Sequence, residues 1–167
     1  MSGTPQIVEL TVGDPRLALV WPVLRELRPH LDDDECARRF ATAVAERGLR
    51  LAAVLTDDAC LAVATYTLQT NLQLGLHAYV DDLVTTASAR SAGHGKALLD
   101  HVAAVTAAAG GTAVRLDSGV QRHGAHRFYL RERFDIVSHH FLKRLDAAQA
   151  TPSTSATSKR TGRSSCS

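Results

Sequence analysis

The segment 90–96 (Arg-Ser-Ala-Gly-His-Gly-Lys) places two glycines, one residue apart, between an apolar run and the start of a helical pattern. Glycine adopts positive φ and carries no side chain, so consecutive backbone N–H groups can approach an anion closely there. The positive end of the helix that follows strengthens the attraction. These residue types at this spacing predict a phosphate-binding loop, although a glycine turn before a helix can also be purely structural.

A second block, residues 125–134, contains Tyr129 in a short predicted helix. Its phenol, with a pKa of about 10, stays protonated at neutral pH and can donate a proton to a leaving group. The alternative is a tyrosine that packs under a sheet as an amphipathic core residue. The block therefore predicts either a proton donor or a core contact.

Together the two blocks resemble the motifs of the GCN5-related N-acetyltransferases (GNAT). The first is Arg-x-x-Gly-x-Gly at 90–95, and the second is an alanine, three residues, a tyrosine and a later phenylalanine within 125–134. A dinucleotide-binding loop would instead carry a third glycine where Leu98 stands. The resemblance implies an enzyme that moves an acetyl group from acetyl-CoA directly to a primary amine of a small molecule or of a protein or peptide. An alternative that keeps the same loop is a non-catalytic acyl-CoA-binding regulatory module.

The same resemblance assigns the residues that hold acetyl-CoA. It places the pyrophosphate on the backbone amides of Ser91, Ala92, Gly93, His94, Gly95 and Lys96. It pairs the pantetheine arm, like an added strand, with the main chain of Leu83, Val84 and Thr85. Arg90 either supports the loop or adds positive charge. Arg122 stands where many members keep a cofactor-binding asparagine, and an arginine there can reach a CoA phosphate instead.

The resemblance also implies the proton transfers. Tyr129 protonates the departing CoA thiolate, and the acceptor ammonium must first lose a proton because it has no lone pair for attack. Asp117, just past the strand expected at 113–116, matches the position of an acidic base in some members, whereas others use an ordered water. Asp81 and Asp82 are rivals. As neighbours on a strand they should point to opposite faces, so that at most one lines the acceptor cleft.

Hydrophobic periodicity and turn residues predict the elements that position these side chains. Strands are expected at 7–12, 49–55, 59–68, 77–84, 113–116 and 136–145, and helices within 17–48, after the glycine loop and at 122–131. The order β α α β β β α β α β predicts an α/β (α+β) fold of the GNAT type. Its central sheet is mixed, mostly antiparallel and flanked by helices.

Other titratable residues have simpler interpretations. The acidic run 32–35 either caps the second helix or attracts a cationic amine. His123 and His126 lie one helical turn apart, but no third ligand follows at a recognisable spacing, so no metal is predicted. The three cysteines are far apart and form no Cys-x-x-Cys pair, which predicts reduced thiols.

A length of 167 residues with a hydrophobic content of 45% fits one domain. We expect a single acyl-CoA N-acyltransferase-like domain at 1–146 and a disordered, basic, Ser/Thr-rich tail at 147–167. The nearly neutral domain disfavours a nucleic-acid surface, and the tail leaves only a salt-sensitive association open. No signal peptide and no run of roughly 18 apolar residues occurs, which predicts a cytoplasmic protein without a membrane partner. The exposed sheet edges of this fold leave a homodimer open.

Overall fold

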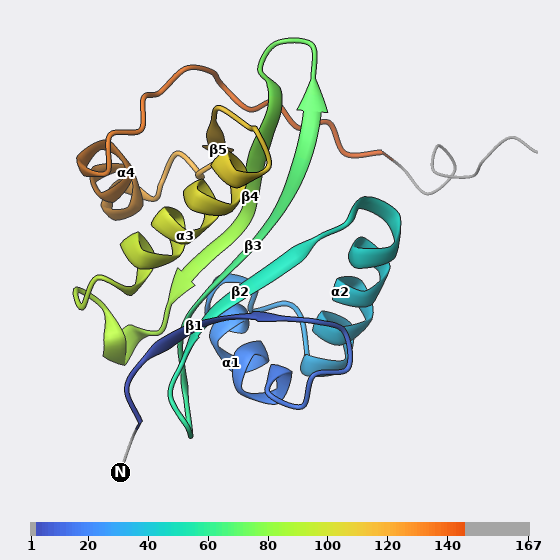
Figure 1. Ribbon diagram of the computed structural model, residues 1–167, viewed down its shortest axis with the longest axis vertical. Coiled ribbons are helices and arrows are strands. Elements are labelled where there is room, and N and C mark those ends of the chain that lie inside the picture. The colour runs from blue at the N-terminus through green and yellow to red at the C-terminus, as the bar shows by residue number, and fades with distance from the viewer. Residues whose placement is uncertain (1–2, 146–167) are drawn as a thin grey trace, which may run out of the picture. The chain divides into compact units, whose positions relative to one another are not determined.

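The computed structural model describes residues 3–145, coloured along the chain in Figure 1. Its elements in chain order are β1 (Gln6–Leu10), α1 (Leu17–Leu27), α2 (Asp33–Arg47), β2 (Arg50–Leu55), β3 (Cys60–Asn71), β4 (Gly75–Thr85), the 3-10 helix η1 (Ala87–Ala89), α3 (His94–Ala108), β5 (Val114–Leu116) and α4 (His123–Arg131). The strands form one sheet in the order β1-β2-β3-β4-β5, antiparallel as far as β4 and parallel between β4 and β5. This confirms the predicted mixed, mostly antiparallel sheet. The tail predicted at 147–167 lies outside the described residues.

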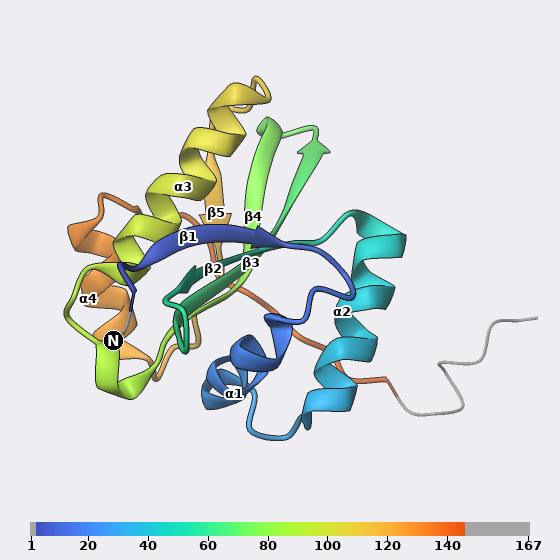
Figure 2. The same ribbon diagram turned by 60° about the horizontal axis from the view of Figure 1, so that its bottom comes forward.

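Helices cover both faces of the sheet, α1 and α2 on one and α3 and α4 on the other (Figure 2). Alternation along β2 shows why both faces are apolar. Leu51, Ala53 and Leu55 pack in the cluster under α1 and α2, whereas Ala52 and Val54 pack in the cluster under α3. The sheet is thus buried on both sides, and no helix within residues 3–145 is long and apolar enough to cross a membrane.

A β-bulge interrupts the pairing of β3 with β4. Thr65 lies opposite Asp82 and Tyr66 lies opposite Val80, so Asp81 is an extra residue on β4. A bulge places two residues of one strand opposite one residue of its partner and breaks the alternation of side chains between the two faces. Residues after the bulge are therefore displaced by one position relative to a regular strand.

The bulge corrects the prediction that Asp81 and Asp82 point to opposite faces. Arg47 of α2 pairs with Asp81 (Nη1 to Oδ2, 3.0 Å), and Arg28, which follows α1, pairs with Asp82 (Nη2 to Oδ1, 2.7 Å). Both carboxylates thus reach arginines on the α1 and α2 side. The prediction was wrong because it assumed an uninterrupted strand, and nothing in the local sequence marks the extra residue.

β4 and β5 lie together over only part of their length. Ala78, Tyr79 and Val80 are in register with Val114, Arg115 and Leu116, whereas β4 continues to Thr85. Past Val80, this edge of β4 has no strand neighbour among residues 3–145. The Asp81 carbonyl oxygen accepts from Arg28 Nη2 at 3.5 Å, and the following N–H and C=O groups of this edge are available to an extended ligand, as at any unpaired strand edge.

The strand predicted at 136–145 is not formed. These residues have no regular secondary structure and belong to a second compact unit, separate from the unit that ends at Asp135. Their apolar side chains stay exposed, Phe141 by 91%. The segment has apolar residues in adjacent pairs, Ile136-Val137 and Phe141-Leu142, so no single face of an extended strand would be apolar.

Candidate active site

The predicted phosphate-binding loop leads from η1 into the first turn of α3. Gly93 is the N-cap of α3 and has φ 85° and ψ 0°, a left-handed conformation that favours glycine. No side chain caps the helix, and the first helical hydrogen bond joins Ala97 N to Gly93 O at 3.0 Å. The amides that precede this bond in the first turn have no intrahelical acceptor. They belong to His94, Gly95 and Lys96. An uncapped helix start of this kind is suited to a phosphate.

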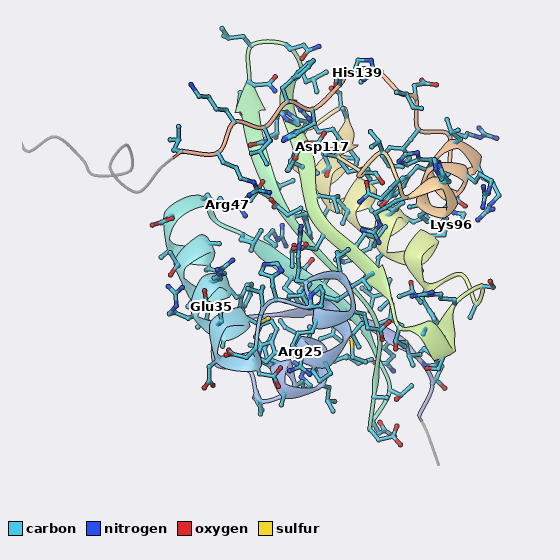
Figure 3. All side chains as sticks on the ribbon, turned by 180° about the vertical axis from the view of Figure 1, so that it is seen from behind. Arg25, Glu35, Arg47, Lys96, Asp117 and His139 are labelled. Carbon is cyan, nitrogen blue, oxygen red and sulfur yellow. The ribbon has the colours of Figure 1, made fainter. Side chains whose placement is uncertain are left out.

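The charged side chains of the loop are engaged by neighbouring carboxylates. Lys96 Nζ lies 2.5 Å from Asp100 Oδ2, one turn further along α3, and this hydrogen bond raises the pKa of Lys96 (Lys96 is labelled in Figure 3). Arg90 Nη2 lies 3.7 Å from Glu26 Oε2. Of the two roles considered for Arg90, this contact favours support of the loop. What the loop offers an anion is therefore mainly its backbone.

Gly95 lies between the end of β4 and α4. A Cβ built on Gly95 would stand 3.5 Å from Thr85 Oγ1 and 3.5 Å from Phe128 Cζ, which is ordinary van der Waals contact. Protein packing alone therefore does not require glycine at this position. The absence of a side chain beside the free amides of the first turn suits the close approach of an anion such as a diphosphate.

A cleft of about 530 Å³ opens where β4 and β5 diverge. Its walls are residues 26–29 at the end of α1 and just after it, part of β4, most of the segment 116–122 and Tyr129 of α4. Of the residues predicted for the site, the cleft brings together Leu83, Asp117, Arg122 and Tyr129. Val84 and Thr85 follow Leu83 on β4 but do not line it, and of the two rival carboxylates it includes Asp81 and not Asp82.

Tyr129 lies at the cleft with its ring packed among aromatic side chains. Its ring centroid is 5.3 Å from that of Phe128 and 5.8 Å from that of Phe134. Burial raises the pKa of Tyr129, and the nearby charge of Arg122 opposes this shift. The hydroxyl makes no hydrogen bond within residues 3–145, and burial favours its protonated form. Tyr129 thus has the ring contacts of a core residue and also lines the cleft, where a proton donor would have to lie.

Asp117 is held in the cleft wall by a phenol. Its Oδ2 accepts a hydrogen bond of 2.6 Å from the Tyr79 hydroxyl (Asp117 is labelled in Figure 3). Burial, together with this hydrogen bond and the charge of Asp117, raises the pKa of Tyr79 to about 12, so the phenol stays protonated. The guanidinium of Arg115 lies 5.3 Å from the centre of the Tyr79 ring. Asp117 is thus an oriented carboxylate in the wall of the cleft.

The rival carboxylates differ in their surroundings. Burial raises the pKa of Asp81, and its ion pair with Arg47 opposes that shift. Asp82 accepts hydrogen bonds from Arg28 Nε at 2.8 Å and from the Thr65 hydroxyl at 2.8 Å. Asp82 is therefore a structural anchor of β4, whereas Asp81 contributes charge to the cleft wall.

Glu26 is a residue of the site that sequence reasoning missed. Its carboxylate accepts hydrogen bonds from the Thr86 hydroxyl (2.5 Å) and from Ala87 N (3.1 Å), at the start of the loop that leads to α3. It also lines the cleft. Glu26 stands 60 positions from Thr86 in an amphipathic helix, so no motif or spacing connects the two.

Other reactive side chains lie outside the cleft. Cys36 and Cys60 are free and buried, and burial raises the pKa of the Cys60 thiol to about 11, which disfavours the nucleophilic thiolate. His126 Nε2 lies 3.0 Å from Gly119 O. In the described part of the chain, no three His, Cys, Asp or Glu side chains are grouped as a metal site would need.

The acidic run 32–35 caps α2. Asp32 is the N-cap, and its side chain accepts a hydrogen bond of 2.7 Å from Glu35 N. Glu35 in turn pairs with Arg38 and Arg39 at 2.7 and 2.6 Å. None of the four acidic residues lines the cleft. Of the two interpretations of this run, these contacts favour the cap.

Replacing Asp32 with alanine should therefore lower stability and leave activity unchanged. Loss of an N-cap side chain costs about 1 kcal/mol of the free energy of unfolding. Denaturant unfolding of Asp32→Ala measures this loss, and Asp34→Ala, which removes an exposed carboxylate of the same turn without a cap bond, is the control. Weaker binding of a cationic amine by Asp32→Ala, with unfolding unchanged, would restore the interpretation that the run attracts a cationic amine.

Comparisons with known proteins show the family and the fold of the chain. The model of the acetyltransferase (GNAT) family matches residues 16–134. The "Uncharacterized N-acetyltransferase YhdJ" of Bacillus subtilis (strain 168) is 37% identical over 124 residues, which cover 74% of this chain and 87% of that protein. The aminoglycoside N-acetyltransferase AAC(6')-Iy in complex with CoA is 14% identical and superposes with a TM-score of 0.76, covering 87% of this chain and 96% of its own. The same enzyme with the bisubstrate analogue CoA-S-monomethyl-acetylneamine has a TM-score of 0.73 at 15% identity, covering 86% and 99%.

Proposed function

The chain belongs to the GNAT family of acetyltransferases, and from this premise we propose how its cleft carries out the transfer. The protein is an acetyl-CoA-dependent N-acetyltransferase. Acetyl-CoA, the cosubstrate, supplies an acetyl group activated as a thioester. One observation carries the assignment of the site: the glycine loop and the cleft lie on the same two elements, β4 and α4. Leu83 of β4 and Tyr129 of α4 line the cleft. Gly95 lies between Thr85 of β4 and Phe128 of α4.

For acetyl-CoA we propose a position along this continuous surface. The diphosphate binds the backbone amides of the loop and the first turn of α3: Ser91, Ala92, Gly93, His94, Gly95 and Lys96. The pantetheine arm lies along the unpaired edge of β4 and hydrogen-bonds the main chain of Leu83, Val84 and Thr85. Arg90 supports the loop through Glu26, and Arg122, at the cleft, provides a cation for a CoA phosphate.

The acceptor is, in this proposal, a primary amine of a small molecule or of a protein or peptide. Glu26, Asp81 and Asp117 give the cleft three carboxylates against the two guanidinium groups of Arg28 and Arg122, and this small excess of negative charge favours a cationic amine. Asp117, or an ordered water beside it, takes the proton that the ammonium must lose before it can attack. The amine nitrogen then forms a bond to the acetyl carbon as the carbon–sulfur bond breaks, and the Tyr129 hydroxyl gives its proton to the sulfur. The extra proton on the new amide nitrogen leaves and returns the Tyr129 phenolate to the phenol.

The activity is tested by incubating the purified protein with acetyl-CoA and a panel of small amines, polyamines and peptides. Release of free CoA thiol, followed with a thiol-reactive dye, should require both the protein and an amine. Calorimetry with CoA separates the other outcomes. Binding without turnover on any acceptor would favour a regulatory module, and absence of binding would reject the proposed site.

Replacing Asp117 with asparagine tests the acidic base. Asparagine keeps an oxygen that can accept the Tyr79 hydrogen bond but cannot take up a proton at neutral pH, so kcat/KM for the amine should fall about tenfold. The dissociation constant for CoA should stay within about twofold of wild type, because the substituted group lies on the acceptor side. An unchanged kcat/KM in Asp117→Asn would assign the proton transfer to water.

A further inference from the structure

The part of β4 that follows Val80 has no pairing with β5, and side chains of residues 26–28 hold it at both ends. At the first end, Arg28 donates from Nε to Asp82 Oδ1 at 2.8 Å and from Nη2 to the Asp81 carbonyl oxygen at 3.5 Å. These are the two residues of the bulge. Arg28 therefore fixes the point at which β4 leaves β5.

At the other end of the segment, Glu26 holds the start of the loop. Its two carboxylate oxygens accept hydrogen bonds from the Thr86 hydroxyl and Ala87 N, and Arg90 lies 3.7 Å away. Thr86 directly follows β4, and Ala87 begins η1. Glu26 thus connects the end of α1 to the chain between β4 and the phosphate-binding turn.

We propose that Glu26 and Arg28 are positioning residues that hold the acyl-CoA-binding surface in its binding shape before the ligand arrives. Residues 83–85 lie between the two anchors. Both anchors come from the end of α1 and the turn after it, and both line the cleft. A strand edge and loop that are fixed in advance lose less conformational entropy when a ligand binds. This inference rests on the proposed function, because it assumes that the diphosphate binds at 91–96.

The sign of the expected effect separates support from simple electrostatics. A carboxylate near a diphosphate repels it, so if Glu26 acted only through its charge, its removal would strengthen CoA binding. Removal would also release Arg90 from its acidic partner. If Glu26 instead positions the loop, its removal weakens binding. The two interpretations therefore predict opposite changes.

The experiment compares Glu26→Ala and Glu26→Gln with wild type by calorimetry with CoA and by steady-state kinetics. Alanine removes both hydrogen bonds from Glu26 to the loop. Because hydrogen bonds to charged groups contribute substantially to the stability of the loop conformation that binds CoA, the dissociation constant for CoA should rise about tenfold. Glutamine can accept from Ala87 N and donate to the Thr86 hydroxyl, so it should restore binding to within about twofold of wild type. The KM for acetyl-CoA should follow the dissociation constant, with kcat changed less.

Two further variants keep the result interpretable. Glu46→Ala removes an exposed carboxylate of α2 that lies outside the cleft and the loop, and this variant should bind CoA like wild type. Thr86→Val removes only the hydroxyl that donates to Glu26. In the double variant with Glu26→Ala, Thr86→Val should raise the dissociation constant for CoA less than it does in the wild-type background, because both changes remove the same hydrogen bond. Equal or tighter CoA binding in Glu26→Ala would overturn the inference. A wild-type protein that binds no CoA would instead reject the proposed function.

Discussion

Replacing Tyr129 with phenylalanine is expected to lower kcat about 100-fold while leaving the dissociation constant for CoA within about twofold of wild type. The phenylalanine ring can keep the contacts with Phe128 and Phe134, so the variant loses only the hydroxyl. Without that donor, the departing thiolate must take its proton from water. Thiol release under saturating acetyl-CoA and amine measures kcat, and calorimetry measures CoA binding.

Tyr66→Phe is the control for the loss of a phenol elsewhere. The Tyr66 side chain is fully buried, and its hydroxyl donates to Glu9 Oε1 at 2.6 Å, away from the residues that line the cleft. This variant should lose stability and retain its turnover rate. A value of kcat in Tyr129→Phe within a factor of about two of wild type would leave Tyr129 as a core residue alone.

The pH dependence of the wild-type rate follows from the same group. A general acid is lost as the pH rises through its pKa, and burial raises the pKa of Tyr129 above its ordinary value of about 10. Loss of the Tyr129 proton therefore causes no decline in kcat between about pH 7 and 9.

Replacing Gly93 with valine is expected to weaken CoA binding about 100-fold. A β-branched residue at φ 85° is strongly strained, so the turn must change its conformation and redirect the amides of the first turn of α3. Loss of two charge-assisted hydrogen bonds to the diphosphate accounts for an effect of about this size. Calorimetry with CoA gives the dissociation constant.

Gly110→Val is the matched control for the backbone. Gly110 also has φ 85°, with no atom near the position of its missing side chain, but it lies just past the other end of α3. Both variants should therefore lose thermal stability, and only Gly93→Val should lose CoA affinity. Equal losses of affinity in the two variants would mean that strain in α3, rather than the geometry of the phosphate-binding turn, controls binding.

Local chemistry made part of the site predictable from sequence. Gly93 marks a turn because its backbone freedom is a property of the residue itself, and Tyr129 lies in a helix whose apolar residues recur at helical spacing. Gly95, the other glycine of the motif, lies in the first turn of α3 without positive φ. The bulge at Asp81 could not be predicted, because the extra residue is defined only by its pairing with β3. Glu26 was missed for a similar reason, since its partners are distant in sequence.

Predictions that depend on contacts between elements distant in sequence were confirmed only in part. The sheet follows from alternating and helical periodicities that each element carries on its own, whereas the strand expected at 136–145 needed a partner that its sequence does not specify. The limits of the domain at 146, the cytoplasmic location, the homodimer and the absence of a nucleic-acid partner stay predictions. Residues 147–167 lie beyond the described part of the chain.

The bulge also decides how β4 would respond to a change of length. Leu83 lies opposite Ala64 and Val84 opposite Val63, and each pair packs on one face of the sheet, as it would in a strand without Asp81. Deleting Asp81 would therefore leave these later side chains on their faces. The deletion would straighten β4 and remove the carboxylate that Arg47 binds.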